Sequence, residues 1–151
     1  MGEYIMLKKL ENLITSAAFE EAEKLFKNNS FKDFSEEMLY VTYENSSITN
    51  YSFIHYLLTK KESSELHDLA FDLLVNPLCH IEGAYHSALY HAKRSVDLTK
   101  EENVDSLLQL LFLHSVPDKL ISDQKAIAIC NTILELDAFN IIATETIKEL
   151  Y

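Results

Sequence analysis

The segments ALYHAKRSVDL, at residues 88–98, and AIAICNTILEL, at residues 126–136, share one spacing of small and apolar residues. Each has two small residues four positions apart and an apolar residue four positions later. The two segments lie 38 residues apart, and the same frame occurs 70 residues before the first of them, at Ala18, Ala22 and Phe26. Positions four apart share one face of an α-helix, and a period of about 34–45 residues is typical of stacked helix pairs. This spacing predicts an all-α fold of antiparallel helix pairs.

The low content of turn-forming residues also favours helices. The chain has 151 residues but only 2 glycines and 2 prolines, whereas average usage is about 7% and 5%. It contains no Asn-Gly or Asp-Gly dipeptide of the kind that closes β-hairpins. Its length is typical of one domain, and no change in composition marks a boundary. We therefore expect residues 1–151 to form a single helical-repeat-like or bundle domain of about eight or nine helices.

Apolar residues recur with a helical period along the whole chain. Ser63 or Ser64 and Ser122 are expected to cap helices, and Pro77 is expected to end one at the preceding residue. Segment 104–114 is apolar nearly all round, so we expect it in the middle of the molecule. The predicted helices cover residues 4–16, 18–27, about 34–44, 49–59, 64–75, 80–98, 104–114, 123–136 and 138–150.

The chain resembles degenerate tetratricopeptide or HEAT-like repeats, most clearly in ILELDAFNIIA at residues 133–143. It departs from the tetratricopeptide pattern because it has no tryptophan and no Leu-Gly pair within the repeat, and Ala138 stands where that pattern has proline. The resemblance implies a stack of helix pairs. An ordinary helical bundle is the alternative.

The charge balance excludes several classes of partner. The chain has 13 Lys and Arg residues against 24 Asp and Glu residues, a net charge of −11, and Arg94 is its one arginine. Nucleic acids and anionic membrane surfaces need a basic face, so neither is expected as a partner. The longest apolar run is far shorter than the roughly 20 residues of a membrane span. The two cysteines and the absence of a secretion signal predict a cytoplasmic protein.

Candidate metal ligands gather at Cys79, Glu82 and His86, which would share one face if they lay on a continuous helix. Thiolate, carboxylate and imidazole groups can bind zinc. However, no H-E-x-x-H or Cys-x-x-Cys pair supports a metal site, and no glycine-rich loop offers a phosphate site or an oxyanion hole. The pattern favours a structural role for these residues, no cofactor and no enzymatic activity. Metal-assisted catalysis through the three residues is a third-ranked hypothesis.

Acidic residues form two stripes that point away from the predicted core. Residues 62–92 contain five acids and no Lys or Arg, although like charges four positions apart on a helix repel each other. A solvated face that only keeps the protein soluble is the plain interpretation. The alternative is a surface for a cationic protein, with Tyr40, Tyr43 and Tyr51 as aromatic anchors. The candidate partner-binding residues are Glu36, Glu37, Tyr40, Tyr43, Glu44, Glu65, Asp68 and Asp72.

In overall character, a small acidic helical chain without catalytic motifs resembles the immunity proteins that are paired with bacterial toxins. That resemblance implies an inhibitor that covers the basic cleft of a cognate toxin domain, such as a nuclease. The leading hypothesis is therefore a non-enzymatic immunity protein. The second is a helical-repeat adaptor that holds a peptide or protein partner in a groove between helices.

Overall fold

The chain is all-helical, as its sequence predicts. The computed structural model describes residues 1–151, apart from the side chain of Glu3, and within them it has nine helices and no strand. The helices are α1 (Gly2–Thr15), α2 (Phe19–Asn28), α3 (Phe31–Asn45), α4 (Ile48–Lys60), α5 (Ser64–Val75), α6 (Ala84–Leu98), α7 (Val104–Phe112), α8 (Asp123–Leu136) and α9 (Ile141–Leu150).

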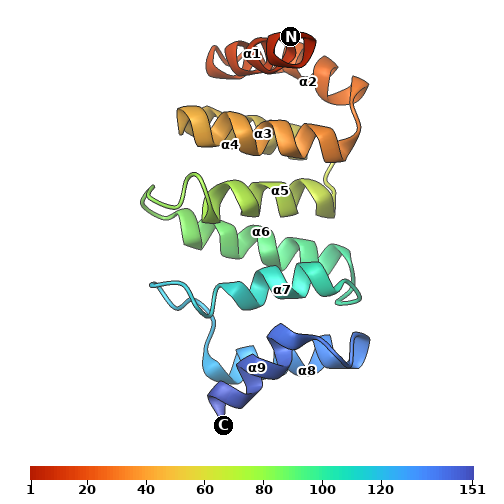
Figure 1. Ribbon diagram of the computed structural model, residues 1–151, viewed down its shortest axis with the longest axis vertical. Helices are drawn as coiled ribbons and strands as arrows, with labels where there is room; N and C mark the ends of the chain where they lie inside the picture. Colours follow the sequence, from red (N-terminus) through yellow and green to blue (C-terminus); the bar gives the residue numbers. More distant parts are fainter.

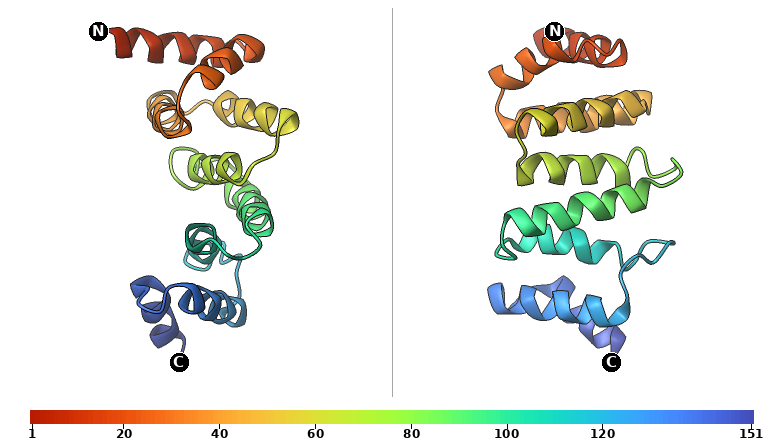
Figure 2. Two further views of the ribbon diagram at one scale, coloured as in Figure 1. Left: turned by 90° about the vertical axis from the view of Figure 1, so that its right-hand side faces the viewer. Right: turned by 180° about the vertical axis from the view of Figure 1, so that it is seen from behind.

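The helices stack in layers along one axis, with the two chain termini at opposite ends (Figure 1). Seen from the side, α3, α5 and α7 form one row, and α4, α6 and α8 form a second row beside it (Figure 2, left). Helix α5 contacts α3 and α7 in its own row and α4 and α6 in the other. This zigzag brings α5 and α7 together, although α6 separates them in the sequence.

Short polar side chains start most of the helices. In α3, α4, α5, α7, α8 and α9, a serine or asparagine just before the helix accepts a hydrogen bond from a backbone N–H of the first turn. Such a cap satisfies a donor that has no partner within the helix. The predicted caps at Ser63 and Ser122 are confirmed. The predicted end of the helix before Pro77 is also confirmed, because α5 ends at Val75.

Two clusters of buried apolar residues form the core, and α5 contributes to both. Leu66, Leu69 and Leu73 belong to the cluster of the first half of the chain. Phe71 and Leu74 belong to the cluster of the second half. Because α5 is buried on both sides, it is the central helix. The prediction for segment 104–114 was wrong: α7 ends at Phe112, that side chain is 45% exposed, and the helix forms one edge of a surface groove.

The small residues of the repeated frame lie where helices pack closely. Ala88 and Ala92 are fully buried on α6, whose contact with α5 is the most extensive between any two helices. Ala126 and Cys130 are fully buried on α8, and Ala22 on α2. A larger side chain at these positions would push the helices apart. The frame therefore marks helix–helix contacts in three layers of the stack.

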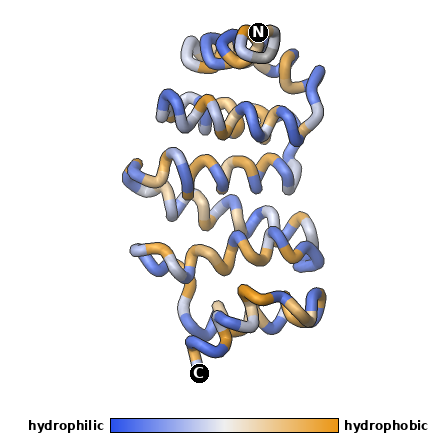
Figure 3. The backbone as a smooth tube through the Cα atoms, in the orientation of Figure 1, coloured by the Kyte–Doolittle hydropathy of each residue, from blue (hydrophilic) through white to orange (hydrophobic). Residues whose placement is uncertain are grey.

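Hydrophobic and hydrophilic stretches alternate along the chain (Figure 3). This alternation is the pattern of amphipathic helices that cover a core and face water. Among the described residues, no helix combines the length and the hydrophobicity needed to cross a membrane.

Candidate functional site

An open groove of about 350 Å³ lies between α5 and α7. Apolar side chains form its walls, and the rings of Phe71 and Phe112 meet edge to face with their centres 6.2 Å apart. Carboxylate and amide groups stand between these walls. We call this feature the acidic groove; its lining residues are Phe71, Asp72, Val75, Asn76, Asp105, Leu108, Gln109 and Phe112.

The carboxylates of the acidic groove influence one another. Burial raises the pKa of Asp72 to about 6, and the charge of Asp68, one turn earlier on α5, adds to this effect. Burial also raises the pKa of Asp68; a hydrogen bond from Ser95 opposes this effect, and the charges of Glu65 and Asp105 add to it. Over the part of the chain that the structure describes, no Lys or Arg forms an ion pair with any of these four acids. The negative charges of the groove carboxylates are therefore not compensated by an ion pair with Lys or Arg.

Two oxygen atoms at the acidic groove are buried without a hydrogen-bond donor. They are Oδ1 of Asp68 and Oε1 of Gln109. A buried acceptor without a partner costs about 1–3 kcal/mol, and folded proteins contain few such atoms. The acceptors that line the groove and can meet donors from outside are the carboxylates of Asp72 and Asp105.

The structure places the acidic residues predicted on α3 apart from this groove. Glu36, Tyr40, Tyr43 and Glu44 are exposed and Glu37 is half-buried, so the stripe does face away from the core. Glu36, Glu37 and Tyr40 line a hollow between α1 and α3, and Tyr40 and Glu44 line another. The two predicted stripes therefore lie on successive helices of one row and do not merge into one pocket.

On α5, the three predicted acids divide between two environments. Asp72 lines the acidic groove, and Asp68 lies beside it. Glu65 lines a hollow on the other side of α5, together with Lys60 and Lys61. Glu65 therefore faces a mixed rather than a purely acidic surface.

Tyr51, one of the predicted aromatic anchors, is half-buried on α4. Its hydroxyl lies 2.8 Å from Nε2 of the buried residue His91, inside the protein. The ring packs against both apolar clusters. The hydroxyl and much of the ring of Tyr51 are therefore engaged inside the protein.

The single helix that would align Cys79, Glu82 and His86 does not form. Cys79 and Glu82 lie in the turn before α6, which begins only at Ala84 because Gly83 adopts a left-handed conformation just before it. His86 lies on α6, and its Nδ1 is 3.8 Å from Oδ2 of Asp118. Among the described residues, no three His, Cys, Asp or Glu side chains come close enough together to hold a metal ion.

A second polar cluster lies in the core between α4, α5 and α6. Nδ1 of His67 is 2.8 Å from Nδ1 of His91, and Nε2 of His67 is 2.9 Å from Oε1 of Glu62. Arg94 donates two hydrogen bonds to Glu62 at the surface. We call Tyr51, His91, His67, Glu62 and Arg94 the histidine network. Burial lowers the pKa of His91 to about 3, and the positive charge that His67 and His55 would carry adds to the effect.

The histidine network can satisfy each of its members. A carboxylate only accepts hydrogen bonds, so Glu62 requires His67 to donate through Nε2. With neutral rings, Nδ1 of His67 then accepts from Nδ1 of His91, whose Nε2 accepts from the hydroxyl of Tyr51. Each polar atom in this chain has one partner of the right kind, which indicates a structural role.

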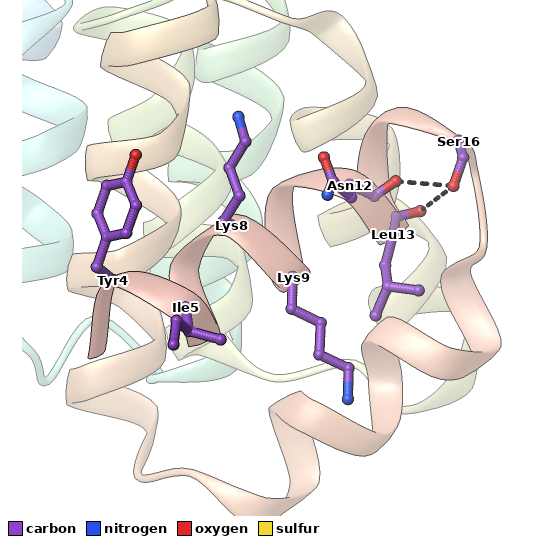
Figure 4. Close-up of a pocket in the computed structure, with 7 residues that line it drawn as sticks. All are labelled: Tyr4, Ile5, Lys8, Lys9, Asn12, Leu13 and Ser16. Atoms are coloured by element: carbon purple, nitrogen blue, oxygen red, sulfur yellow. Dashed lines mark hydrogen bonds between the residues drawn. The ribbon is translucent and has the colours of Figure 1, made fainter. Parts of the chain in front are cut away.

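A second hollow, on α1, has a different character (Figure 4). Residues of α1 and its C-terminal cap line it, among them Ile5, Lys8 and Lys9. Its polar groups are largely paired: Lys8 forms an ion pair with Glu11, and Ser16 donates to the backbone carbonyls of Asn12 and Leu13. This hollow offers no unpaired buried acceptor among the described residues that line it.

The sequence pattern did not single out the α7 side of the acidic groove, which consists of Asp105, Leu108, Gln109 and Phe112. Asp105 lies in the first turn of α7, where an acidic residue usually interacts with the helix dipole and carries no further signal. The pairing of His67 with His91 was also missed, because the two residues are 24 positions apart. No protein-family model, no curated protein and no solved structure matches this chain.

Proposed function

We propose that this protein is a non-enzymatic inhibitor that binds a cationic protein through the acidic groove, as an immunity protein binds its toxin. One observation carries this proposal. Asp72 and Asp105 line the groove and form no ion pair with Lys or Arg among the described residues, and burial raises the pKa of Asp72 to about 6. A partly desolvated carboxylate without a cation destabilises the free protein, and a bound cationic partner would offset that penalty.

The class of partner follows from the charge. A protein with a net charge of −11 creates a field that accelerates its encounter with a basic surface. A nuclease domain must carry such a surface, because it attracts the phosphates of its substrate. The carboxylates of this protein would compete with those phosphates for the basic cleft of the nuclease. We propose that the protein inhibits a basic toxin nuclease by covering this cleft.

The exposed residues of α3 would form the edge of this interface. Tyr40 is 53% exposed and Tyr43 is 60% exposed, and both stand beside Glu36 and Glu44 on the same row of helices as the groove. Tyrosines are common among the residues that contribute most to binding. In this proposal the acidic groove holds the central contact, and α3 extends it along the stack.

An adaptor that binds an extended peptide is the second candidate. The observation that favours it is the shape of the site, because a groove with aromatic walls and Asn76 at its end can hold a peptide segment. An adaptor would bind a short basic segment of its partner as tightly as the whole partner. An inhibitor needs the folded domain and abolishes its activity.

The experiment uses the chain as bait in an extract of its source cells. The baits are the wild-type protein, the variant Asp72→Asn/Asp105→Asn, and a matched control, Glu145→Gln/Glu149→Gln, which removes two exposed charges from α9. We expect a basic protein to bind the wild type and the control in a 1:1 ratio and the groove variant about tenfold or more weakly. We also expect its toxic or nuclease activity to disappear when the wild-type chain is added.

Two results would contradict the proposal. One is equal retention of the partner by all three baits, which would place the interface away from the acidic groove. The other is a partner that keeps its full activity when the chain is present at saturating concentration. In that case the chain is a binding protein but not an inhibitor.

A further inference from the structure

We infer that this chain binds a second copy of itself head to tail, with Phe139 of one copy seated in the hollow on α1 of the next copy. We call that hollow the α1 hollow (Figure 4). The contact does not involve the acidic groove, so the inference is independent of the proposed function. It is carried by an exposed apolar cluster, by a hollow that can hold it, and by the charges of the two surfaces.

The turn between α8 and α9 exposes large apolar side chains. Phe139 is 91% exposed and Ile141 is 73% exposed. Single exposed apolar residues are common, but a cluster larger than a few hundred Å² commonly marks an interaction site. We call this cluster the α8–α9 patch; its residues are Leu136, Phe139, Ile141 and Ile142.

Hydrogen bonds hold this turn in one conformation. The carboxylate of Asp137 accepts from the backbone N–H of Phe139 at 3.3 Å and from the side-chain amide of Asn140 at 3.1 Å. The side chain of Asn140 also accepts from the backbone N–H of Ala143 and caps α9. Phe139 is therefore displayed on an ordered turn, and an anchor that is fixed before binding loses little conformational entropy when it binds.

The α1 hollow offers space and apolar contacts for this side chain. Its volume is about 500 Å³, and Tyr4, Ile5 and Leu13 supply its apolar surface. A hollow of this size is within the usual range of binding pockets. The charged residues that line it are Lys8 and Lys9.

Charge favours the α1 hollow over the other hollows of the molecule. The α8–α9 patch is flanked by Glu135 and Asp137, which form no ion pair with Lys or Arg among the described residues. The acidic groove and the hollows beside α3 and on the other side of α5 all contain acidic residues that would repel it. The described lining of the α1 hollow contains no acid, and Lys9 has no ion-pair partner there. Complementary charges of this kind select one partner surface over others.

The α8–α9 patch and α1 lie at opposite ends of the stack (Figure 1). One copy therefore cannot fill its own hollow, and the contact must join two copies. Because the two surfaces differ, each copy that is added brings another patch and another hollow. A contact of this type forms a ring or an open chain of copies.

The test begins with sedimentation equilibrium of the full-length protein. An interface of this size binds weakly, so we expect monomers at about 10 µM and an average mass above that of a dimer at about 1 mM. A protein that stays monomeric over this range would overturn the inference.

Variants show which surfaces meet. Phe139→Ser/Ile141→Ser should weaken self-association about tenfold or more, whereas Leu98→Ser, which removes an exposed apolar side chain from α6, should leave it unchanged. Lys9→Glu should weaken it about fivefold. Lys93→Glu changes the net charge by the same amount at an exposed position on α6 and should have a much smaller effect.

A mixture of two variants tests the head-to-tail geometry. Phe139→Ser/Ile141→Ser keeps the α1 hollow, and Lys9→Glu keeps the α8–α9 patch, so an equimolar mixture retains one intact contact. We expect the mixture to form a 1:1 dimer and nothing larger, although each variant alone is largely monomeric. The circular dichroism spectrum of each variant reports whether it is folded.

Two further results would overturn the inference. One is a wild-type dimer that Lys9→Glu does not weaken more than Lys93→Glu does, because the patch would then bind a surface other than the α1 hollow. The other is a mixture of the two variants that stays monomeric at a concentration where the wild type associates. Neither result affects the proposed inhibition of a basic partner, which is measured with the acidic-groove variants.

Discussion

The histidine network and the acidic groove share helix α5, but the polar groups of the network have partners within the protein, whereas the carboxylates of the groove have no cation. The ring nitrogens of His67 have partners within 2.9 Å on α6 and in the turn before α5. The next residue, Asp68, is influenced by the charge of Asp105 on α7 and keeps one buried oxygen atom without a hydrogen-bond partner. Two adjacent residues of one helix therefore differ in whether their polar atoms are satisfied.

This difference indicates which region serves the fold and which serves binding. A buried polar network with all its hydrogen bonds made can stabilise one packing arrangement. Like charges and unpaired acceptors destabilise the free protein, and such features are retained mainly where function needs them. Substitutions should therefore have opposite effects on stability in the two regions.

The largest effect is expected for His91→Ala. This substitution leaves a cavity in the core and removes the partner of both His67 and Tyr51. We expect a loss of about 3 kcal/mol in the free energy of unfolding, measured by urea denaturation. The double variant His67→Leu/His91→Leu removes both rings, and its free energy of unfolding should decrease by less than twice that amount. A loss below about 1 kcal/mol for His91→Ala would mean that the network contributes little to the fold.

Tyr51→Phe tests one hydrogen bond of the same network. The ring and its packing remain, but Nε2 of His91 loses its partner inside the core. We expect a loss of about 1–2 kcal/mol in the free energy of unfolding. Tyr90→Phe, which removes a hydroxyl from a side chain that is 54% exposed on α6, is the matched control and should change stability by less than about 0.5 kcal/mol. Equal effects of the two substitutions would contradict the hydrogen-bond assignment.

Asp72→Asn should increase the free energy of unfolding, whereas the substitutions in the histidine network decrease it. Folding raises the pKa of Asp72 from 3.8 to about 6, so the folded state binds the proton more tightly than the unfolded state does. Ionisation therefore destabilises the folded protein increasingly between about pH 4 and pH 6, and by a constant amount above that range. The full shift corresponds to about 3 kcal/mol, and water around the partly exposed carboxyl reduces this to about 1 kcal/mol.

The asparagine variant should therefore be more stable than the wild type by about 1 kcal/mol at pH 7.5 and equally stable near pH 4. Urea denaturation at the two pH values measures this difference. Glu145→Gln provides the control for the removal of one exposed charge from a helix. A variant that is less stable than the wild type at pH 7.5 would show that Asp72 has a stabilising partner in the free protein.

The smallest effect is expected for Gln109→Leu. Leucine has nearly the same size and removes the buried oxygen atom that has no donor. We expect a gain of about 0.5 kcal/mol in the free energy of unfolding, measured by urea denaturation. A loss of stability would show that the Gln109 side chain makes a favourable contact in the groove.

The sequence predicted the fold more completely than the site. Helical periods, the caps at Ser63 and Ser122 and the paired alanines depend on residues close together in the chain, and they placed the helices to within a few residues. The acidic groove depends on α5 and α7 lying side by side across α6, and a sequence pattern does not report that proximity. Asp72 was therefore found on its acidic stripe, whereas Asp105 and Gln109 became visible only once the helices were stacked.

The central claim is that the acidic groove keeps the half-buried carboxylate of Asp72 without a cation. It is tested most directly by the NMR titration of the side-chain carboxyl carbon of Asp72 in the free protein. The account predicts a midpoint raised clearly above pH 4, toward pH 6. A midpoint near or below pH 4, the range of an ordinary or ion-paired aspartate, would contradict it.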